Sequence, residues 1–419
     1  WWGSDWVRSG LPGYNESGDG PSEMVQCLTG LPDFRTESSK QVGIPQFLQT
    51  KWTKEGTLSE KQSKYGTSNT VTGFISTWLS DWVRTYGIDG FRCDTAKHVD
   101  KASWKQLKDK CVAALKEWKQ ANPTKKLDDL DFWMTGECWD WNIGYGKDAY
   151  FTQGGFDSMI NFETTGAGLL AAGKIADVYQ GYADKINSDP SFNVLSYISS
   201  HDSTLARPSD MYYLGSAFLL MPGGVQIYYG DESARPLVSG IPFDGKGGAG
   251  HSLRSDMNFG ENTDLVKHWG IVGRFRNSHM AVGAGANVQL TASSGIAFAR
   301  TFDKNGITDK IAAVINASGS VSIDVSAVWA NGTTLENAYD GTTAVVSGGK
   351  VTFSAGAHGT ILIQEPDGER GTVTVQHINQ DTGAVIKTDM VSGLVGESYS
   401  VSADAELTKT YDLVKTEGK

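Results

Sequence analysis

The chain has 419 residues, of which 39% are hydrophobic and 20% charged, so the sequence predicts a globular protein of two or three domains. Its formal net charge of −11 argues against a nucleic-acid partner, because a polyanion is bound by an excess of Lys and Arg. The 13 Trp and 15 Tyr residues suit a protein that stacks aromatic rings on sugars, but on composition alone a large core explains them better.

The four cysteines form no C-x-x-C pair, so the sequence gives no support for a zinc site or a thioredoxin-type motif. They are Cys27, Cys93, Cys111 and Cys138. Their spacing fits free buried thiols and one or two disulfides about equally well. The sequence has no run of roughly 18 apolar residues, which predicts that no helix spans a membrane. It opens WWGSDWVRSG, without Met or a signal peptide, and is therefore expected to be a mature, cut or partial chain.

Residues 1–69 are rich in Gly, Ser, Pro and Trp and show little periodicity. We expect irregular structure there, with a short helical turn near residues 21–28. From residue 70 the pattern changes, because an aromatic residue recurs every four positions, which predicts an amphipathic helix over 70–87. The recurring residues are Phe74, Trp78, Trp82 and Tyr86. A short apolar strand, GIDGFRCD, follows directly.

Strands and helices then alternate to about residue 283. The further strands are predicted at 132–137, 156–162, 193–200 and 224–230, and the helices at 101–121, 166–183, 210–221 and 265–280. This alternation is typical of βα units on a parallel sheet. A doubly wound open sheet is the alternative, but the Gly-rich phosphate loop that normally accompanies it is missing from the sequence.

Acidic residues lie at or just past the ends of four of the five predicted strands. They are Asp94, Glu137, Asp202 and Glu232. In a (β/α)8 barrel the active site lies at the carboxyl ends of the strands. Beyond residue 283 the sequence pattern is typical of β-strands alone. It predicts a small antiparallel sandwich, with strands over 289–302, 310–318, 320–326, 348–356 and 359–365. A polar linker, EPDGERG, then precedes a further β module that looks incomplete.

Arg92 and Asp94 share the same parity on their strand, so both side chains would point to one face. Arg92 would orient Asp94 and favour its ionised form, which a nucleophile needs. Taken alone, however, the pair fits a structural ion pair better. Glu137, in FWMTGECW, lies among aromatic residues and Cys, and burial there would keep it protonated as a general acid. A solvated Glu at a strand end is the equal alternative.

Asp202 ends the mostly apolar strand YISSHD beside His201. The two could orient hydroxyl groups of a substrate, although Asp202 could equally cap the next helix. One βα repeat separates Asp94 from Glu137, and two separate Glu137 from Asp202, so the three would converge at one barrel mouth. Glycoside hydrolysis needs two carboxyl groups across the scissile bond, and retains configuration if they lie about 5–5.5 Å apart. A phosphatase or aldolase would want a metal cluster or an inward Lys, and neither is visible.

These segments resemble the α-amylase superfamily, glycoside hydrolase family 13. GIDGFRCDTAKHVD is similar to the family's strand-four motif, FWMTGECW to the strand-five motif, YISSHD to the strand-seven motif and GGVQIYYGDE to the strand-eight motif. LPDF at 31–34, followed by RTES, is similar to the motif near the end of the domain inserted after strand three. The motifs occur in the family's order over residues 1–364. The opening segment and RTES look most like bacterial periplasmic or secreted α-amylases.

The resemblance implies a role for each matching residue. Asp94 would be the nucleophile, Glu137 the general acid/base and Asp202 the stabiliser of the transition state. The candidate substrate-binding residues are Arg92, Lys97, His98, His201 and Trp139. A structural Ca²⁺ is also implied, bound by the carboxylate of Asp33 and the backbone carbonyl of His98, in keeping with the preference of this ion for oxygen ligands.

The expected fold is therefore α/β. It comprises the end of an inserted domain at 1–69, strands four to eight of a (β/α)8 TIM barrel at 70–283, an all-β sandwich at 284–364, a linker at 365–371 and a partial β module at 372–419. The family's first three barrel strands, and its strand-three motif with an Asn and a His, are missing. The chain is accordingly expected to be a fragment of a longer polypeptide.

The expected function is retaining hydrolysis of internal α-1,4-glucosidic bonds in starch, glycogen and maltodextrins. The alternatives are a glucanotransferase or debranching relative of pullulanase type, and a non-catalytic starch-binding surface protein. The intact Asp94, Glu137 and Asp202 argue against the last. The tail from Gly371 resembles a mucin-binding-type module of Gram-positive surface proteins, which implies contact with cell-surface or mucin glycans. The chain is expected to be secreted or cell-surface.

Overall fold

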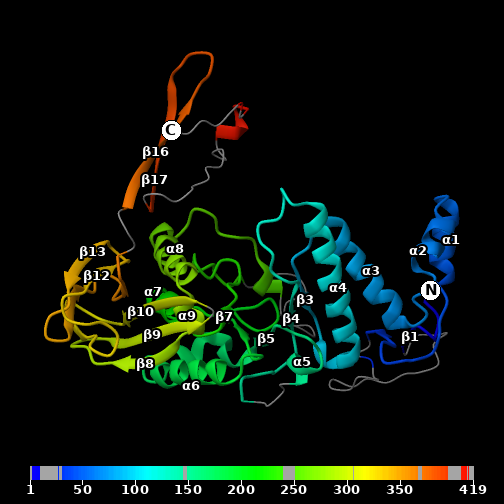
Figure 1. Ribbon diagram of the computed structural model, residues 1–419, viewed down its shortest axis with the longest axis horizontal. Helices are drawn as coiled ribbons and strands as arrows, with labels where there is room; N and C mark the ends of the chain where they lie inside the picture. Colours follow the sequence, from blue (N-terminus) through cyan, green and yellow to red (C-terminus); the bar gives the residue numbers. More distant parts are fainter. Residues whose placement is uncertain are drawn as a thin grey trace.

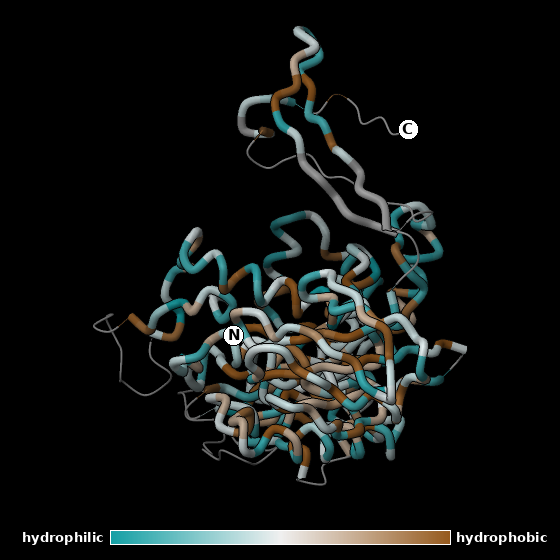
Figure 2. The backbone as a smooth tube through the Cα atoms, turned by 90° about the vertical axis from the view of Figure 1, so that its left-hand side faces the viewer, coloured by the Kyte–Doolittle hydropathy of each residue, from teal (hydrophilic) through white to brown (hydrophobic). Residues whose placement is uncertain are grey.

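A computed structural model describes residues 2–9, 27, 31–144, 149–238, 251–304, 306–366, 370–394, 407–412 and 414. A parallel sheet with its helices makes up the middle of the molecule, and antiparallel sheet lies at the end opposite the N-terminus (Figure 1). The backbone hydropathy in Figure 2 shows apolar residues gathered inside this body, as expected for a buried core.

The parallel sheet has five strands in the order β3-β4-β5-β6-β7, which confirms the predicted number and sequence of strands. Their bounds are β3 Gly90–Cys93, β4 Trp133–Gly136, β5 Ser158–Asn161, β6 Val194–Ser196 and β7 Gly224–Val225. All five are shorter than predicted. The last one was expected to continue to residue 230, but the chain turns at Tyr228, whose carbonyl accepts a hydrogen bond from the N–H of Asp231 at 3.0 Å.

Helices alternate with these strands, as the pattern predicts, except that each of the helices expected at 166–183 and 265–280 is divided into two segments. The helices are α3 Val71–Tyr86, α4 Lys101–Ala121, α5 Ala149–Thr152, α6 Ile175–Ser188, α7 Met211–Leu219, α8 Thr263–Ser278 and α9 Met280–Ala284, with the 3-10 segments η1 Ala96–His98, η2 Phe162–Leu170 and η3 His251–Arg254. The bounds of α4 match the prediction, because the sequence carries its own start signal: the carboxylate of Asp100 accepts from the N–H of Ser103. Likewise Gly87, with φ of 68°, ends α3 in a left-handed conformation that suits glycine.

The aromatic stripe predicted on α3 is only partly buried. Phe74 is buried, but Trp82 and Tyr86 are 57% and 62% exposed. The face that packs against α4 carries small residues instead, and a hydroxyl hydrogen bond of 2.6 Å joins Thr72 on α3 to Ser103 on α4. Small residues let two helices approach closely, so contact with α4 fixes the rotation of α3 and leaves the end of the aromatic stripe at the surface.

The expectation of irregular structure over residues 1–69 is wrong for its second half, which forms two helices. The elements of this segment are β1 Val7–Arg8, β2 Asp33–Phe34, α1 Gln46–Lys54 and α2 Leu58–Tyr65. Both helices are short and mostly polar, so periodicity is weak, and tertiary contacts stabilise them. They bring Trp52 and Tyr65 into an apolar cluster with Trp6 and Phe74. The helical turn expected at 21–28 lies, apart from Cys27, outside the described residues.

The antiparallel part confirms the predicted sandwich of two sheets. Six strands run in the order β13-β12-β15-β10-β9-β8, and β11 pairs with β14. Their bounds are β8 Ala286–Leu290, β9 Ile296–Lys304, β10 Ile307–Ile315, β11 Ser320–Asp324, β12 Thr334–Asn337, β13 Thr342–Val345, β14 Lys350–Ser354 and β15 Ile361–Gln364. Two strands, β12 and β13, were not predicted, because TLEN and TTAV are short and lack a clear apolar alternation. The single strand expected at 289–302 is instead two strands, β8 and β9.

A long hairpin follows the sandwich and projects away from the body (Figures 1 and 2). Its strands are β16 Arg370–Ile378 and β17 Val385–Leu394, paired antiparallel, and η4 Leu407–Lys409 follows. Strand β16 thus begins inside the segment that was expected to be a linker. Within the described part of the chain, no helix is both long enough and apolar enough to cross a membrane.

The sandwich is joined to the helices by a buried polar cluster around His268 on α8. One ring nitrogen, Nδ1, lies 2.7 Å from the hydroxyl of Tyr339, and the other, Nε2, lies 3.0 Å from the hydroxyl of Ser216 on α7. Ser216 in turn lies 2.7 Å from the hydroxyl of Thr360. Burial, with a contribution from nearby His358, lowers the pKa of His268 to about 4, although the carbonyl of Tyr212 and the charge of Asp210 oppose this.

This cluster predicts a stability that falls in mild acid. His268 stays neutral in the folded protein down to about pH 4, whereas an unfolded His takes up a proton near pH 6.5. Between these values the unfolded state binds more protons, so the free energy of unfolding should fall by on the order of 2 kcal/mol as the pH drops from about 7 to about 4.5. Urea unfolding of the protein and of His268→Gln at both pH values measures this, and the same pH dependence in both would contradict it.

Candidate active site

The parallel pairing of β3 and β4 brings Asp94 and Glu137 together. Cys93 pairs with Gly136 at the carboxyl ends of the two strands, so the next residue of each strand leaves the sheet at the same edge. Two backbone hydrogen bonds fix this exit: Glu137 N–H donates to the carbonyl of Cys93 at 2.8 Å, and Ala96 N–H donates to the carbonyl of Glu137 at 2.6 Å. The two carboxylates therefore sit on rigid backbone.

Glu137 is buried, being only 6% exposed, so the alternative of a solvated strand-end Glu is wrong. One carboxylate oxygen, Oε2, accepts a hydrogen bond of 2.8 Å from the N–H of Thr95. Burial raises the pKa of Glu137; the Thr95 N–H and Arg92 lower it, and repulsion from Asp94 and Asp202 raises it further. A raised pKa lets a carboxylic acid keep its proton closer to neutral pH, as a general acid requires.

Thr95 supplies that hydrogen bond from an unusual backbone conformation. Its φ is 46°, in the left-handed region that β-branched residues rarely adopt. The turn it makes between β3 and η1 directs its N–H toward Glu137. Strained backbone of this kind clusters at functional sites, where the surrounding structure maintains it.

Arg92 and Asp94 lie on one face, as their parity predicted, and the guanidinium donates a hydrogen bond to the carboxylate. Asp94 is 66% exposed and the Arg92 side chain 36% exposed. An ion pair this exposed contributes no more than about 1 kcal/mol to stability, so it has little structural value. It does hold an accessible carboxylate in a fixed direction beside Glu137.

Asp202 completes a group of three carboxylates, because its charge acts on Glu137 together with that of Asp94. Its Oδ2 lies 2.9 Å from Nε2 of His201, so this pair is also brought together as expected. The alternative role of Asp202 as a helix cap is wrong, since the carboxylate of Asp210 caps α7 by accepting from the N–H of Tyr213 at 2.8 Å.

The remaining candidates differ in accessibility. Trp139 is exposed and lies with its ring centroid 5.1 Å from that of Phe162, so a flat aromatic face stands next to Glu137 in the chain. Lys97 is half-buried and His98 buried, both in the 3-10 turn η1 that follows Asp94. Buried His98 is less accessible to a bound molecule than exposed His201.

The two residues expected to hold Ca²⁺ lie near each other, since the charge of His98 acts on the carboxylate of Asp33. That carboxylate, however, accepts from the buried guanidinium of Arg8, which also bonds to Glu37. Ca²⁺ takes about 6–8 oxygen ligands. The part of the chain that the structure describes has no group of three or more His, Cys, Asp or Glu residues arranged for a metal. These residues alone therefore do not fit the ion, because Arg8 already supplies the positive charge.

All four cysteines are free and buried, which resolves the alternatives that the sequence left open. Burial raises the pKa of Cys93 and of Cys111 to about 12, so both thiols stay protonated and unreactive.

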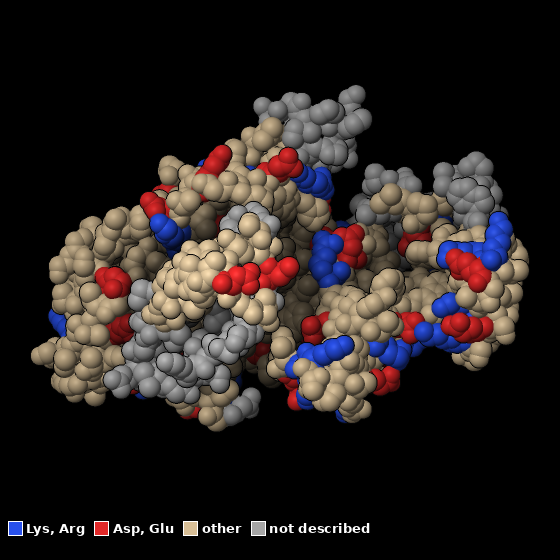
Figure 3. Space-filling view, turned by 90° about the horizontal axis from the view of Figure 1, so that it is seen from above, with Lys and Arg blue, Asp and Glu red and all other residues tan. Residues whose placement is uncertain are grey.

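Asp94, Glu137 and Asp202 do not line the aromatic groove that the described residues form. That groove, of about 680 Å³, lies between α1, α2 and α3 and is walled by aromatic residues such as Trp52, Trp78 and Trp82. The face of the molecule shown in Figure 3 is hollowed near its middle, and acidic and basic side chains lie beside one another there.

Two residues at the site were missed by the sequence reasoning. Thr95 contributes through its backbone, which no side-chain pattern reveals. Arg254 Nη2 donates to Oδ1 of Asp202 at 2.9 Å across 52 positions of sequence. Arg254 follows a segment without periodicity, so only the folded chain brings it to Asp202.

No protein-family model matches the chain. The chain is 40% identical over 309 residues to the periplasmic α-amylase of Escherichia coli K12, a match covering 72% of this chain and 42% of that protein. It is 27% identical over 348 residues to the α-amylase of Streptomyces lividans, covering 70% of this chain and 35% of that protein. The chain thus spans less than half the length of these two curated relatives.

Two solved structures share the fold. The α-amylase of Geobacillus thermoleovorans, in complex with acarbose, matches with a TM-score of 0.56 and 15% identity over 87% of this chain and 72% of that one. An Anoxybacillus α-amylase matches with a TM-score of 0.52 and 19% identity over 83% of this chain and 68% of that one. At such low identity the likeness concerns the fold alone.

Proposed function

Because the chain belongs to the α-amylase superfamily, we propose that it carries the catalytic carboxylates of a retaining hydrolase that cleaves internal α-1,4-glucosidic bonds of starch, glycogen and maltodextrins. The observation that carries this proposal is the pairing of a buried Glu137, with raised pKa, and an exposed Asp94 held by Arg92 at the ends of adjacent strands.

In the first half of the proposed reaction, Glu137 gives its proton to the glycosidic oxygen while Asp94 attacks the anomeric carbon. The bond to the leaving sugar breaks, and a covalent glycosyl ester forms on Asp94. In the second half, the Glu137 carboxylate takes a proton from water, whose oxygen attacks the anomeric carbon and releases Asp94. Both carboxyl groups end in their starting states.

The neighbours of this pair have supporting roles. Arg92 orients Asp94 for attack, and Asp202 with His201 binds hydroxyl groups of the reacting sugar as positive charge develops on its ring. Trp139 offers a flat aromatic face to a neighbouring sugar ring. Lys97 and His98, on η1, are proposed to contact sugar beyond the cleavage point. Lys97 is the more accessible of the two, because the side chain of His98 is buried.

For the architecture, we propose that β3 to β7 are strands four to eight of a (β/α)8 barrel, with residues 1–69 the end of an inserted domain, 284–364 a sandwich domain, 365–371 a linker and 372–419 a separate β module. Polypeptide outside these 419 residues would supply the other strands. In support, β3 and β7 are edges of the described sheet, and an open edge is a liability in water.

The barrel proposal predicts that the 419-residue chain alone is inactive or poorly folded, since half of its pocket wall would be missing. Expression of this chain beside the complete natural polypeptide, followed by circular dichroism and starch hydrolysis, measures both properties. Equal specific activity of the two would contradict the proposal.

Three further expectations stand as proposals. The E. coli relative is named periplasmic, which supports a location outside the cytoplasm, either secreted or at the cell surface. Contact of the tail with mucin glycans would be lost from the complete polypeptide on deletion of residues 372–419. Ca²⁺ bound through Asp33 and His98 would need further oxygen ligands and a displaced Arg8, so no step of the reaction is assigned to it.

The proposed activity is tested by product analysis on starch and pullulan with the complete natural polypeptide. Starch should yield a range of maltooligosaccharides, and pullulan, in which α-1,6 bonds interrupt the chain, should be cleaved far more slowly. Preferred cleavage of pullulan would identify a debranching enzyme instead. Products longer than a maltooligosaccharide donor would identify a glucanotransferase, and a lack of turnover would identify a binding protein.

A further inference from the structure

We propose that Arg254 is a positioning residue, which fixes the orientation of the Asp202 carboxylate, and that the buried Arg235 holds Arg254 in place to do so. The inference rests on the proposed function, because it assigns a purpose to a neighbour of Asp202. It concerns a segment, residues 251–258, that lies just before α8 and far from the strand-end motifs in the sequence.

Both oxygens of Asp202 are engaged by side chains from different parts of the chain. Oδ2 lies 2.9 Å from Nε2 of His201, and Oδ1 accepts from Nη2 of Arg254 at 2.9 Å. Asp202 lies between β6 and α7, outside regular secondary structure. An exposed Asp carboxylate rotates about its side-chain bonds unless contacts hold its oxygens. Arg254 supplies the contact that the sequence neighbour His201 cannot.

Arg254 lies in a short 3-10 turn, yet the backbone on either side of it is tightly held. The carbonyl of Leu253 accepts from the hydroxyl of Tyr228 at 3.0 Å and from Nη2 of Arg235 at 3.1 Å. The carbonyl of Ser255 accepts from the hydroxyl of Tyr229 at 2.7 Å and from Nη1 of Arg235 at 3.2 Å. One guanidinium thus binds the residue before Arg254 and the residue after it.

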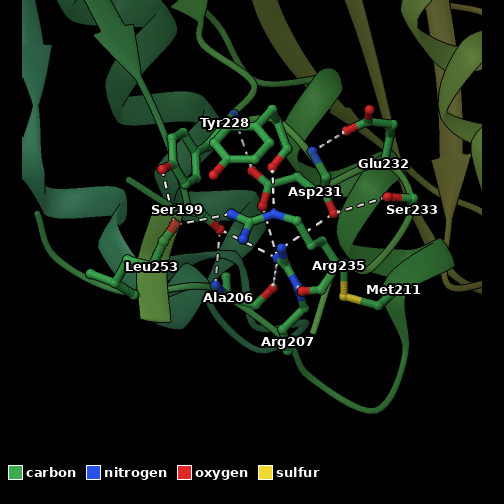
Figure 4. A network of polar contacts seen from close by, with 12 residues as sticks. Ser199, Ala206, Arg207, Met211, Tyr228, Asp231, Glu232, Ser233, Arg235 and Leu253 are labelled. Carbon is green, nitrogen blue, oxygen red and sulfur yellow. Dashed lines mark hydrogen bonds and ion pairs between the residues drawn. The ribbon is translucent and has the colours of Figure 1, made fainter. Parts of the chain in front are cut away.

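Arg235 can serve as this clamp because several hydrogen bonds hold its guanidinium within a network of polar contacts (Figure 4). It is fully buried, and its guanidinium lies over the ring of Tyr229 with its central carbon 4.1 Å from the centroid. Its carbonyl accepts from Nε of Arg207 at 2.7 Å, and Arg207 in turn pairs with the buried Asp231 at 2.8 Å.

Gly230 makes this packing feasible. Its φ is 84°, and a Cβ there would meet the Cβ of Arg235 at 2.4 Å, closer than carbon atoms can approach. The GDESAR segment after β7 therefore holds Arg235 in a fixed place, and Arg235 in turn fixes the position of residues 253–255. A buried charge that makes several hydrogen bonds to backbone carbonyls is costly to assemble, and a role in holding the site explains it.

Exposure separates the roles of the two arginines. The side chains of Arg254 and Asp202 are each 40% exposed, so their ion pair is solvated and adds little to folding stability. Replacing Arg254 should therefore alter catalysis and leave the fold intact. Replacing Arg235 would disturb both, and it is not the variant of choice.

The test is the Arg254→Gln variant of the complete natural polypeptide, assayed on maltoheptaose. If Asp202 acts in the transition state, kcat should fall roughly 10- to 100-fold, as for other small misplacements at active sites, with KM changed less than about threefold. Inhibition by acarbose, the ligand of the Geobacillus relative, should weaken as well. Arg254→Lys should recover part of the loss, because its ammonium can still reach one oxygen.

Arg84→Gln is the matched control, because Arg84 is 43% exposed and pairs with Glu117 on the surface of α4; its kinetics should be unchanged. Tyr229→Phe removes one donor to the Ser255 carbonyl and should lower kcat by a few-fold. An Arg254→Gln variant with unchanged kcat, or with only KM altered, overturns the inference. If Glu137→Gln is also fully active, the proposed function fails, and the two failures are thereby distinguished.

Discussion

Replacing Glu137 with Gln should lower the hydrolysis of starch by about 10³-fold or more, because the leaving sugar then departs without a proton. The amide keeps the shape of the side chain but has no proton to give. A substrate with a good leaving group, such as α-maltosyl fluoride, needs little protonation, so formation of the intermediate should stay within about tenfold of the unsubstituted protein. Steady-state rates on both substrates, with the burst of fluoride release, measure this.

The pH profile provides a second readout of the same variant. As the proposed general acid, Glu137 would act when protonated, and burial raises its pKa, so activity should persist toward neutral pH and decline as the pH rises through that raised value. The Gln variant should lose this basic limb on the fluoride substrate. Glu117→Gln, on the surface of α4, is the control and should keep the limb. A burst of fluoride release that is slowed as much as the hydrolysis of starch would contradict the assignment of Glu137 as the acid. A slow steady state on the fluoride would not, because Glu137 also serves as the base of the second step.

Replacing Asp94 with Asn should lower the rate on starch and on α-maltosyl fluoride alike, by on the order of 10⁴-fold, because neither can form the glycosyl ester. The melting temperature should change little, since the exposed pair with Arg92 contributes no more than about 1 kcal/mol. Calorimetry of the variant therefore controls for unfolding.

The configuration of the products formed with azide tests the roles of both carboxylates. In an Asp94→Gly variant, azide can occupy the vacated space and attack the anomeric carbon directly, which should give a β-glycosyl azide of inverted configuration. In Glu137→Gln, azide should instead attack the ester on Asp94 and give the α-glycosyl azide. The opposite assignment of products would show that the roles of the two carboxylates are exchanged.

Local patterns predicted much of the fold because they agree with the tertiary structure. Helix α4 has its cap at Asp100 and ends before Pro123, and both signals lie in the sequence itself. Helices α1 and α2 could not be found in this way, since they depend on burying Trp52 and Tyr65 in a cluster assembled from distant segments. The exposure of Trp82 and Tyr86 on α3 likewise depends on a tertiary contact, the packing of α3 against α4.

The candidate site shows the same division. Asp94 and Glu137 could be predicted as neighbours, because parallel strands end at one edge of a sheet. The burial of Glu137 was one of two equal alternatives, because the aromatic residues beside it in the sequence do not show whether they cover it in the fold. The backbone donor of Thr95 depends on a left-handed turn, and Arg254 depends on the Arg235 clamp, so neither leaves a periodic or compositional mark in the sequence.

The most direct test of the central claim is proton NMR of the first products released from maltoheptaose by the complete natural polypeptide. If Asp94 forms a covalent intermediate that Glu137 helps water to break, each of the two displacements inverts the anomeric carbon, and the new reducing end appears first as the α-anomer. The β-anomer should grow in only later, by mutarotation. Initial appearance of the β-anomer would mean a single displacement by water, which would contradict the assignment of Asp94 as the nucleophile.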